Sequence, residues 1–162
     1  MLKVKREGII IKPTKLAFEK LATLNPGIYQ EGKYVHVLYR AVSERFVSTI
    51  GYAKLNGPLN VVERWKKPLF EPEYEYEKKG MEDPRITKIG NEIIVTYVAH
   101  DGKNAQIAYL HGQNLFDLKR GGIISPQITY KRAAKLMSFS KVKDDYFFFS
   151  SYYEKYAGKN VI

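Results

Sequence analysis

The chain repeats a sequence pattern at a constant spacing, and this repeat constrains its fold more than any other feature. Asn25-Pro26-Gly27-Ile28 precedes an apolar segment at 35–41, and Asp83-Pro84-Arg85-Ile86 precedes another at 93–99. Both parts of the second copy lie 58 residues after the corresponding parts of the first. Each copy continues with two more strand-like segments, at 47–54 and 61–65 in the first copy and at 105–111 and 115–119 in the second. Units of about four strands at such a period are typical of propeller blades.

A third copy begins near Leu136. A turn at 141–145 precedes an apolar segment at 146–152, and the sequence stops at Ile162, soon after the next turn. We therefore predict an all-β chain forming one partial β-propeller domain over 1–162, with repeats near 25–80, 83–130 and 136–162, the last incomplete. Because a propeller closes by radial repetition, about two and a half blades would need a longer protein or a second chain to complete it. The alternative is a β-sandwich with a fortuitous repeat.

Helical signals are confined to one segment. Residues 15–24 are expected to form a helix, with Thr14 as its possible N-cap. Tyr39, Tyr97 and Trp65 are expected to pack in the core. The alternation of glutamates with Tyr74 and Tyr76 between 71 and 77 is interpreted as a solvated edge or loop, not a metal site.

The composition limits the possible functions. There is no cysteine and there are three histidines, so neither a disulfide framework nor a metal site built on these residues is expected. The net charge of +10 fits a nucleic-acid partner, an anionic substrate such as phosphate, or an ordinary lysine-rich surface. Because the lysines are scattered and form no block, nucleic acid is the least favoured of these. No apolar run approaches membrane-spanning length, so a soluble cytoplasmic protein without a membrane partner is expected.

The densest chemistry lies in the segment 80–86. Proline disfavours the helical region for the residue before it, so Asp83 is predicted to be extended. Side chains on an extended chain alternate faces, which would put Asp83 and Arg85 on one face and Glu82 on the other. A carboxylate beside a guanidinium makes a plausible sugar or phosphate site, and equally an ordinary structural ion pair.

Three other residues carry possible site chemistry, each with a structural alternative. Arg40 ends an apolar strand, where its charge must reach water or a partner. Asn25 before Pro26 could bind a ligand or simply initiate a turn. Asp101 before Gly102 forms a common hairpin-turn pair.

Together these segments resemble glycoside hydrolase family 130, the β-mannoside phosphorylases and mannosidases. The resemblance runs from about Phe18 to Phe149 and covers about the first half of the family's usual length. Its most specific element is Glu82-Asp83-Pro84-Arg85. The other matching segments are 25–27, 38–41, 48–53 and 96–102. The resemblance implies a five-bladed β-propeller with the active site in its central funnel.

The resemblance also implies a chemistry and a set of site residues. Members cleave β-mannosides with inversion, and Asp83 matches their catalytic acid, which in the phosphorylases acts through a sugar hydroxyl. The sugar contacts of the family map onto Asn25, Arg40, Glu82, Arg85 and Asp101. Inorganic phosphate is the co-substrate of the phosphorylases, with no cofactor, and Lys135 is the candidate that would bind it. Gln106 departs from the family pattern, because an arginine is common at its position.

The residues favour one version of this chemistry. Inverting hydrolysis needs an acid and a base far enough apart to admit water. A phosphorylase needs only the acid, because phosphate is already an anionic nucleophile, and basic side chains offset its charge. One carboxylate motif with a basic surplus therefore predicts phosphorolysis of a β-mannoside to mannose 1-phosphate. An inverting β-mannoside hydrolase, a non-catalytic glycan-binding fragment and a nucleic-acid-binding protein are the alternatives.

Overall fold

The computed structural model describes residues 5–125, which form an all-β molecule. Two single turns of 3-10 helix, η1 (Ala17–Glu19) and η2 (Glu75–Glu77), each precede one group of strands. The strands are β1 (Ala22–Glu31), β2 (Tyr34–Val42), β3 (Ser48–Asn56), β4 (Asn60–Arg64), β5 (Gly80–Ile89), β6 (Glu92–His100), β7 (Ala105–Gly112) and β8 (Lys119–Ile123). Within this part of the chain both helices are three residues long, far too short to span a membrane.

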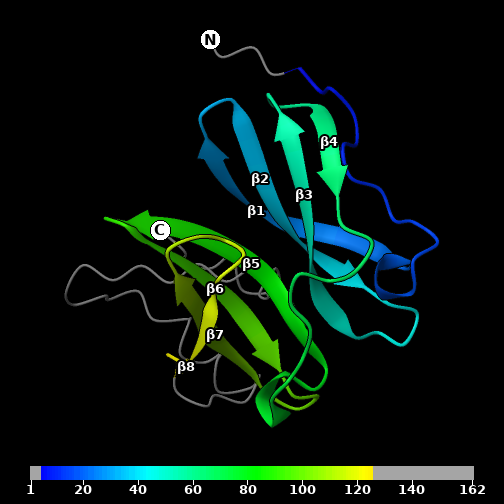
Figure 1. Cartoon of the computed structure of the whole chain (residues 1–162). Coiled ribbons are helices and arrows are strands. Elements are labelled where there is room, and N and C mark those ends of the chain that lie inside the picture. The colour runs from blue at the N-terminus through cyan, green and yellow to red at the C-terminus, as the bar shows by residue number, and fades with distance from the viewer. Residues whose placement is uncertain (1–4, 126–162) are drawn as a thin grey trace, which may run out of the picture.

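Each repeat folds into its own antiparallel sheet. Strands β1 to β4 pair in sequence order, and β5 to β8 do the same. A short parallel bridge between Ser48 and Gly80 joins the two sheets. Figure 1 shows the two twisted sheets as successive units, the first in blue to teal and the second in green to yellow. Two four-stranded units of the same topology in series are consecutive propeller blades, which confirms the predicted fold class for the described residues.

Strand alternation explains how the two blades pack. Neighbouring side chains on a strand point to opposite faces, so one face of β2 and β3 carries Leu38, Ile50 and Tyr52. These fully buried side chains share a core with Val95 and Tyr97 of β6. The same face also carries Arg40 and Ser48, and this register brings both polar residues to the junction between the blades.

The other face of the first blade has a separate, smaller core. Val37, Tyr39 and Leu55 are buried there, and Ile11 and Phe18 from the N-terminal segment pack against them. The N-terminal residues thus cover a face that the second blade does not reach.

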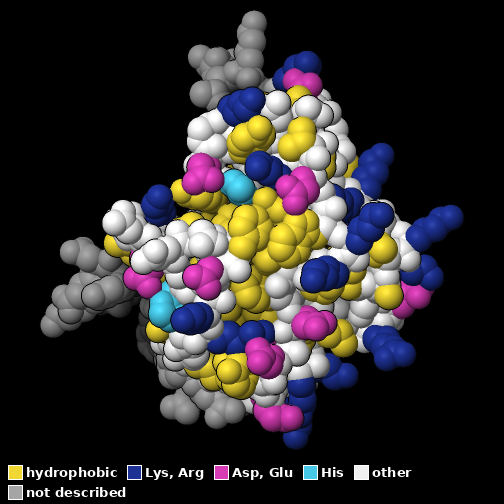
Figure 2. Space-filling model, viewed as in Figure 1, with side chains coloured by type: hydrophobic (Ala, Val, Ile, Leu, Met, Phe, Trp, Pro, Cys, Tyr) yellow, Lys and Arg dark blue, Asp and Glu magenta, His cyan; other side chains and the backbone are white. Residues whose placement is uncertain are grey.

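Aromatic rings extend the contact between the blades. Trp65, which follows β4, stacks on Phe116 from the β7–β8 connection, with ring centres 5.5 Å apart. Tyr52 lies edge-on to both rings. Figure 2 shows hydrophobic side chains gathered at the middle of one face of the molecule. As predicted for Trp65, it packs against the core.

Each blade also buries a glutamate. The hydroxyl of Tyr39 donates to Glu19, and the hydroxyl of Tyr97 donates to Glu77, each partner lying 20 residues earlier in the chain. Both glutamates are 0% exposed. The pKa of both tyrosines is raised above the usual value of 10. Burial is the larger cause, and the hydrogen bond to the carboxylate is the second.

An arginine completes each of these two buried clusters. Arg64 donates to Glu19 at 2.8 Å and Arg120 donates to Glu77 at 3.2 Å. The interpretation of 71–77 as solvated is therefore wrong for Glu77, although Glu71, Glu73 and Glu75 are exposed. Charged groups can be buried in this way because each has hydrogen-bonded partners.

Two local predictions are wrong. The helix expected over 15–24 is only the turn η1, because Ala22, Thr23 and Leu24 instead pair with the end of β2. Strand pairing overrides the local helical propensity there. The last strand of the second copy begins at Lys119, since residues before it form the β7–β8 turn. The predicted third repeat, at 136–162, lies outside the described residues.

Candidate functional site

Asn25 and Asp83 share an uncommon backbone conformation. Their φ angles are 45° and 53°, in the left-handed region that asparagine and aspartate tolerate better than most residues. Each precedes a proline, and each lies in a bulge where the pairing of its strand shifts, at Leu24/Gly27 in β1 and at Glu82/Arg85 in β5. Proline has no N–H to donate, so a bulge suits it. The prediction that Asp83 is extended is therefore wrong.

The bulge changes where the side chains of this segment point. Glu82 and Asp83 both contact Arg40, so they do not lie on opposite faces as predicted. The alternative of a structural ion pair between Asp83 and Arg85 is not realised. Arg85 instead donates to the backbone carbonyl oxygens of Pro84 at 2.9 Å and Asn25 at 3.3 Å. A regular strand alternates its side chains, and the bulge interrupts that alternation.

Arg40 is the centre of the resulting cluster. Its Nη2 donates to Oε1 of Glu82 at 2.8 Å, its Nη1 to Oδ1 of Asp83 at 3.5 Å, and its Nε to Oγ of Ser48 at 2.9 Å. The side chains of Glu82 and Asp83 are 8% and 9% exposed, and that of Arg40 is 21% exposed. Charge-assisted bonds in such a sheltered place are stronger than those between neutral groups. They hold two carboxylates beside one guanidinium.

The two oxygens of Asp83 have different surroundings. Asn25 Nδ2 donates to Oδ1 at 2.8 Å, and Arg40 donates to the same atom. Within residues 5–125, Oδ2 accepts no hydrogen bond. Since Asn25 and Arg40 are both donors there, a proton carried by this carboxyl group belongs on Oδ2. The arrangement can therefore position a carboxyl group that gives up a proton from one defined atom.

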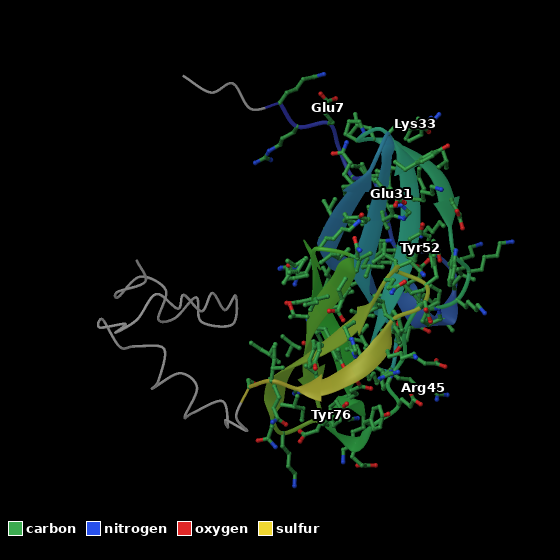
Figure 3. The ribbon with its side chains drawn as sticks, turned by 60° about the vertical axis from the view of Figure 1, so that its left-hand side comes forward. Glu7, Glu31, Lys33, Arg45, Tyr52 and Tyr76 are labelled. Atoms are coloured by element: carbon green, nitrogen blue, oxygen red, sulfur yellow. The ribbon has the colours of Figure 1, made fainter. Side chains whose placement is uncertain are left out.

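The cluster lies at one end of the first blade. Arg40 and Ser48 flank the connection between β2 and β3 that contains Arg45. Figure 3 shows Lys33, at the β1–β2 turn, near the top of the view and Arg45 in its lower part. The candidate site and that turn are thus at opposite ends of the blade.

Backbone contact brings the two blades together beside the site. A Cβ atom added to Gly27 would lie 2.6 Å from the carbonyl oxygen of Pro84, and one added to Gly80 would lie 2.7 Å from Cβ of Ser48. Distances this short leave no room for a side chain at either position. These two glycines allow Asn25 of β1 and Asp83 of β5 to meet.

Asp101 stays within its own turn. Its carboxylate accepts hydrogen bonds from the backbone N–H groups of Lys103 and Asn104 and from the side chain of Asn104. These bonds, chiefly that from the Asn104 backbone, lower the pKa of Asp101 to about 2. Asp101 therefore has the turn-forming role given as its structural alternative. The sugar contact that the family resemblance implies for it stays a prediction.

The remaining predicted site residues are placed as follows. Lys135 lies outside the described residues. Gln106 lies opposite Ala99 in the sheet and is 9% exposed. Within residues 5–125, no three His, Cys, Asp or Glu side chains gather closely enough to hold a metal ion. The structure thus brings together Asn25, Arg40, Glu82, Asp83 and Arg85.

Ser48 belongs to the cluster but was not among the predicted site residues. Its Oγ accepts from Arg40 and donates to Oε1 of Glu82 at 3.3 Å. A signal for it exists in the sequence. In an antiparallel hairpin whose connection is 43–47, Ser48 pairs with Val42 and becomes the diagonal neighbour of Arg40 on the same face.

Comparison with known proteins gives a consistent result. A family model described as β-1,4-mannooligosaccharide phosphorylase matches residues 6–158. A β-1,2-mannobiose phosphorylase of Thermoanaerobacter sp. (strain X514) is 36% identical over 109 residues, which are 59% of this chain and 36% of that protein. A 1,2-β-oligomannan phosphorylase of the same organism is 27% identical over 137 residues, 76% of this chain and 46% of that protein.

Solved structures agree with the fold. A glycosyl hydrolase from Bacteroides ovatus superimposes with a TM-score of 0.65 at 25% identity, covering 70% of this chain and 38% of that one. The chain spans less than half the length of each of these relatives.

Proposed function

The chain belongs to the β-1,4-mannooligosaccharide phosphorylase family, glycoside hydrolase family 130, and on that premise we propose that it cleaves β-mannosides by phosphorolysis. The products are mannose 1-phosphate and a shortened saccharide, formed with inversion at the anomeric carbon. Both curated relatives are named as phosphorylases of β-1,2-linked mannosides, which supports this choice of reaction.

The observation that carries the proposal is the hydrogen bonding of the Asp83 carboxyl group. Two donors from the first blade fix its Oδ1, and Oδ2 is the oxygen that can hold a proton. A general acid must offer its proton from a defined position to the oxygen that leaves. Asp83, on the second blade, meets that requirement with two partners from the first blade.

The reaction then balances with one acid and one nucleophile. An oxygen of inorganic phosphate forms a bond to the anomeric carbon from the face opposite the leaving sugar, and the glycosidic carbon–oxygen bond breaks. The leaving oxygen takes up a proton that comes from Oδ2 of Asp83, passed through a sugar hydroxyl as the family resemblance implies. A single displacement of this kind inverts the configuration.

The other residues of the cluster are proposed to bind the mannosyl unit. Asn25 and Arg40 donate hydrogen bonds to Asp83, and Arg40 also donates to Glu82. Arg85 is exposed beside them. Guanidinium and carboxylate groups are suited to sugar hydroxyls because they donate and accept in fixed directions. Lys135 remains the predicted phosphate ligand.

The test is an assay of the chain, and in parallel of any longer product of its reading frame, with β-1,2- or β-1,4-mannobiose and inorganic phosphate. We expect release of α-mannose 1-phosphate, identified by its anomeric and phosphorus NMR signals. Asp83→Asn should abolish the release, because an amide cannot act as the acid. Asp117→Asn, at an exposed position in the β7–β8 turn, is the matched control and should keep full activity.

Each other outcome points to a different function. Release of free mannose without phosphate would establish an inverting hydrolase. Saccharide binding by calorimetry without turnover would establish a glycan-binding protein. If none of these preparations shows either turnover or binding, the proposal is overturned.

A further inference from the structure

Ser48 occupies the point where the two blades are joined. It is the first residue of β3 and is 1% exposed. Its backbone N–H donates to the carbonyl oxygen of Lys79, and it pairs with Gly80 in the parallel bridge between the sheets. The position of its side chain is therefore fixed by both blades at once.

The hydroxyl group of Ser48 connects two charged groups of the site. It accepts a hydrogen bond from Nε of Arg40 at 2.9 Å and donates one to Oε1 of Glu82 at 3.3 Å. The same Glu82 oxygen accepts from Nη2 of Arg40 at 2.8 Å. Arg40, Ser48 and Glu82 thus form a closed set of three hydrogen bonds.

This closed set determines where the last donor of Arg40 points. A guanidinium group is planar, so fixing Nε and Nη2 also fixes Nη1. Nη1 is directed at Oδ1 of Asp83, and at 3.5 Å this is the longest contact of Arg40 in the cluster. A small rotation of the guanidinium would break that contact first.

We propose that Ser48 is a positioning residue, whose hydroxyl holds the Arg40 guanidinium in the orientation that fixes Oδ1 of Asp83. The proposal rests on the function proposed above, in which Asp83 is the general acid. Ser48 acts only through Arg40 and Glu82. Misplacing a catalytic group by a fraction of an ångström lowers the rate of the chemical step more than it weakens binding.

The test compares Ser48→Ala with two other variants. Ser48→Ala removes both hydrogen bonds, and Ser48→Thr restores a hydroxyl. Thr49→Val is the matched control, because the neighbouring Thr49 is 7% exposed and, among the described residues, its Oγ1 has no hydrogen-bond partner. Steady-state kinetics are measured with β-mannobiose and phosphate, well below the melting temperature of each variant.

We expect Ser48→Ala to lower kcat about 10-fold while KM for the saccharide stays within about twofold. Ser48→Thr should recover most of kcat, and Thr49→Val should match the unmodified protein. An unchanged kcat in Ser48→Ala would overturn the proposal, and so would equal losses in Ser48→Ala and Thr49→Val. If Ser48→Ala does not fold, Ser48→Cys replaces it. Its thiol bonds weakly, so an intermediate kcat is expected and an unchanged kcat overturns the proposal.

A second measurement separates this proposal from the proposed function. The Nε–H signal of Arg40 in ¹⁵N-labelled protein should be protected from exchange and should lose that protection in Ser48→Ala. An unprotected signal in the unmodified protein would overturn the role of Ser48. An unmodified protein with the protected signal but without turnover would refute the enzymatic function and leave the hydrogen-bonded arrangement standing.

Discussion

Asn25 donates a hydrogen bond from Nδ2 to Oδ1 of Asp83 at 2.8 Å, and the two residues occupy the same position in consecutive repeats, 58 residues apart. Both have left-handed backbone conformations, and both precede a proline in a bulge. The repeat therefore places two copies of one strained turn against each other at the junction of the blades. In the second copy the amide is replaced by a carboxyl group, which can hold a proton.

Asn25→Gly is expected to lower kcat/KM about fivefold while leaving stability nearly unchanged. Glycine adopts the left-handed conformation freely, so the variant removes only the amide bond to Asp83. A typical hydrogen bond contributes about 0.5–1.5 kcal/mol, and the solvent exposure of Asn25 reduces its contribution to stability. Kinetics with β-mannobiose and phosphate provide the measurement. Full activity of Asn25→Gly would show that the amide has no role in placing Asp83.

Gly27→Ala is expected to reduce both stability and activity. The new methyl group would lie 2.6 Å from the carbonyl oxygen of Pro84, so the first strands of the two blades would have to separate. Overpacking of this kind costs about 1–3 kcal/mol. Urea unfolding measures the loss, with Ile28→Ala, at the exposed neighbouring residue, as the control. A variant as stable and active as the unmodified protein would mean that the blades are not held this closely.

Much of the fold follows from the sequence because strand alternation is a local signal. The apolar segments at 35–41 and 93–99 became β2 and β6, each with one more residue at both ends. The helix expected at 15–24 failed for the opposite reason. Its last residues pair with Ala41 and Val42, which are distant in sequence, and no local pattern encodes that pairing.

The candidate site was only partly predictable for a similar reason. Extended geometry was expected at Asp83 because proline follows it, yet the chain bulges there. The signal that was present is the pair of residue types, since Asn25 and Asp83 are both of the kind that tolerates a left-handed conformation. The buried Glu19 and Glu77 carried a comparable signal, because they share the repeat spacing and each lies 20 residues before its tyrosine.

Arg120→Met is expected to destabilise the second blade strongly. Arg120 lies beside Glu77, which is 0% exposed, and its removal would leave Glu77 buried without its charged partner. The remaining partners of Glu77 would be the hydroxyl of Tyr97 and the backbone N–H groups of Glu73 and Tyr74. Breaking a buried ion pair from one side costs about 3–5 kcal/mol.

Glu73→Gln tests the same arginine from the solvent side. Glu73 also pairs with Arg120, but its side chain is 63% exposed, so this change should cost less than about 1 kcal/mol. Chemical unfolding of both variants gives the comparison. Equal losses would contradict the assignment of Glu77 as the buried partner that matters for stability.

Asp101→Asn is expected to change the pH dependence of stability more than it changes substrate binding. The pKa of Asp101 is about 2 in the folded protein and 3.8 ordinarily, because Asn104 and Lys103 donate to the carboxylate. A lowered folded-state pKa contributes stability above about pH 4, and this contribution is lost as the pH falls toward 2. The unmodified protein should therefore lose stability more steeply over this window than Asp101→Asn does, as urea unfolding at several pH values would show.

Kinetics of the same variant decide between the two roles open to Asp101. All three hydrogen bonds that its carboxylate accepts from the described residues come from its own turn, so KM for β-mannobiose should stay within about twofold of the original value. A sugar contact made by Asp101 would instead raise KM by about 10-fold, because a lost charge-assisted hydrogen bond weakens binding by that order. Such a rise in KM, together with the same loss of stability at low pH in both proteins, would contradict the structural role of Asp101. It would place Asp101 among the substrate-binding residues.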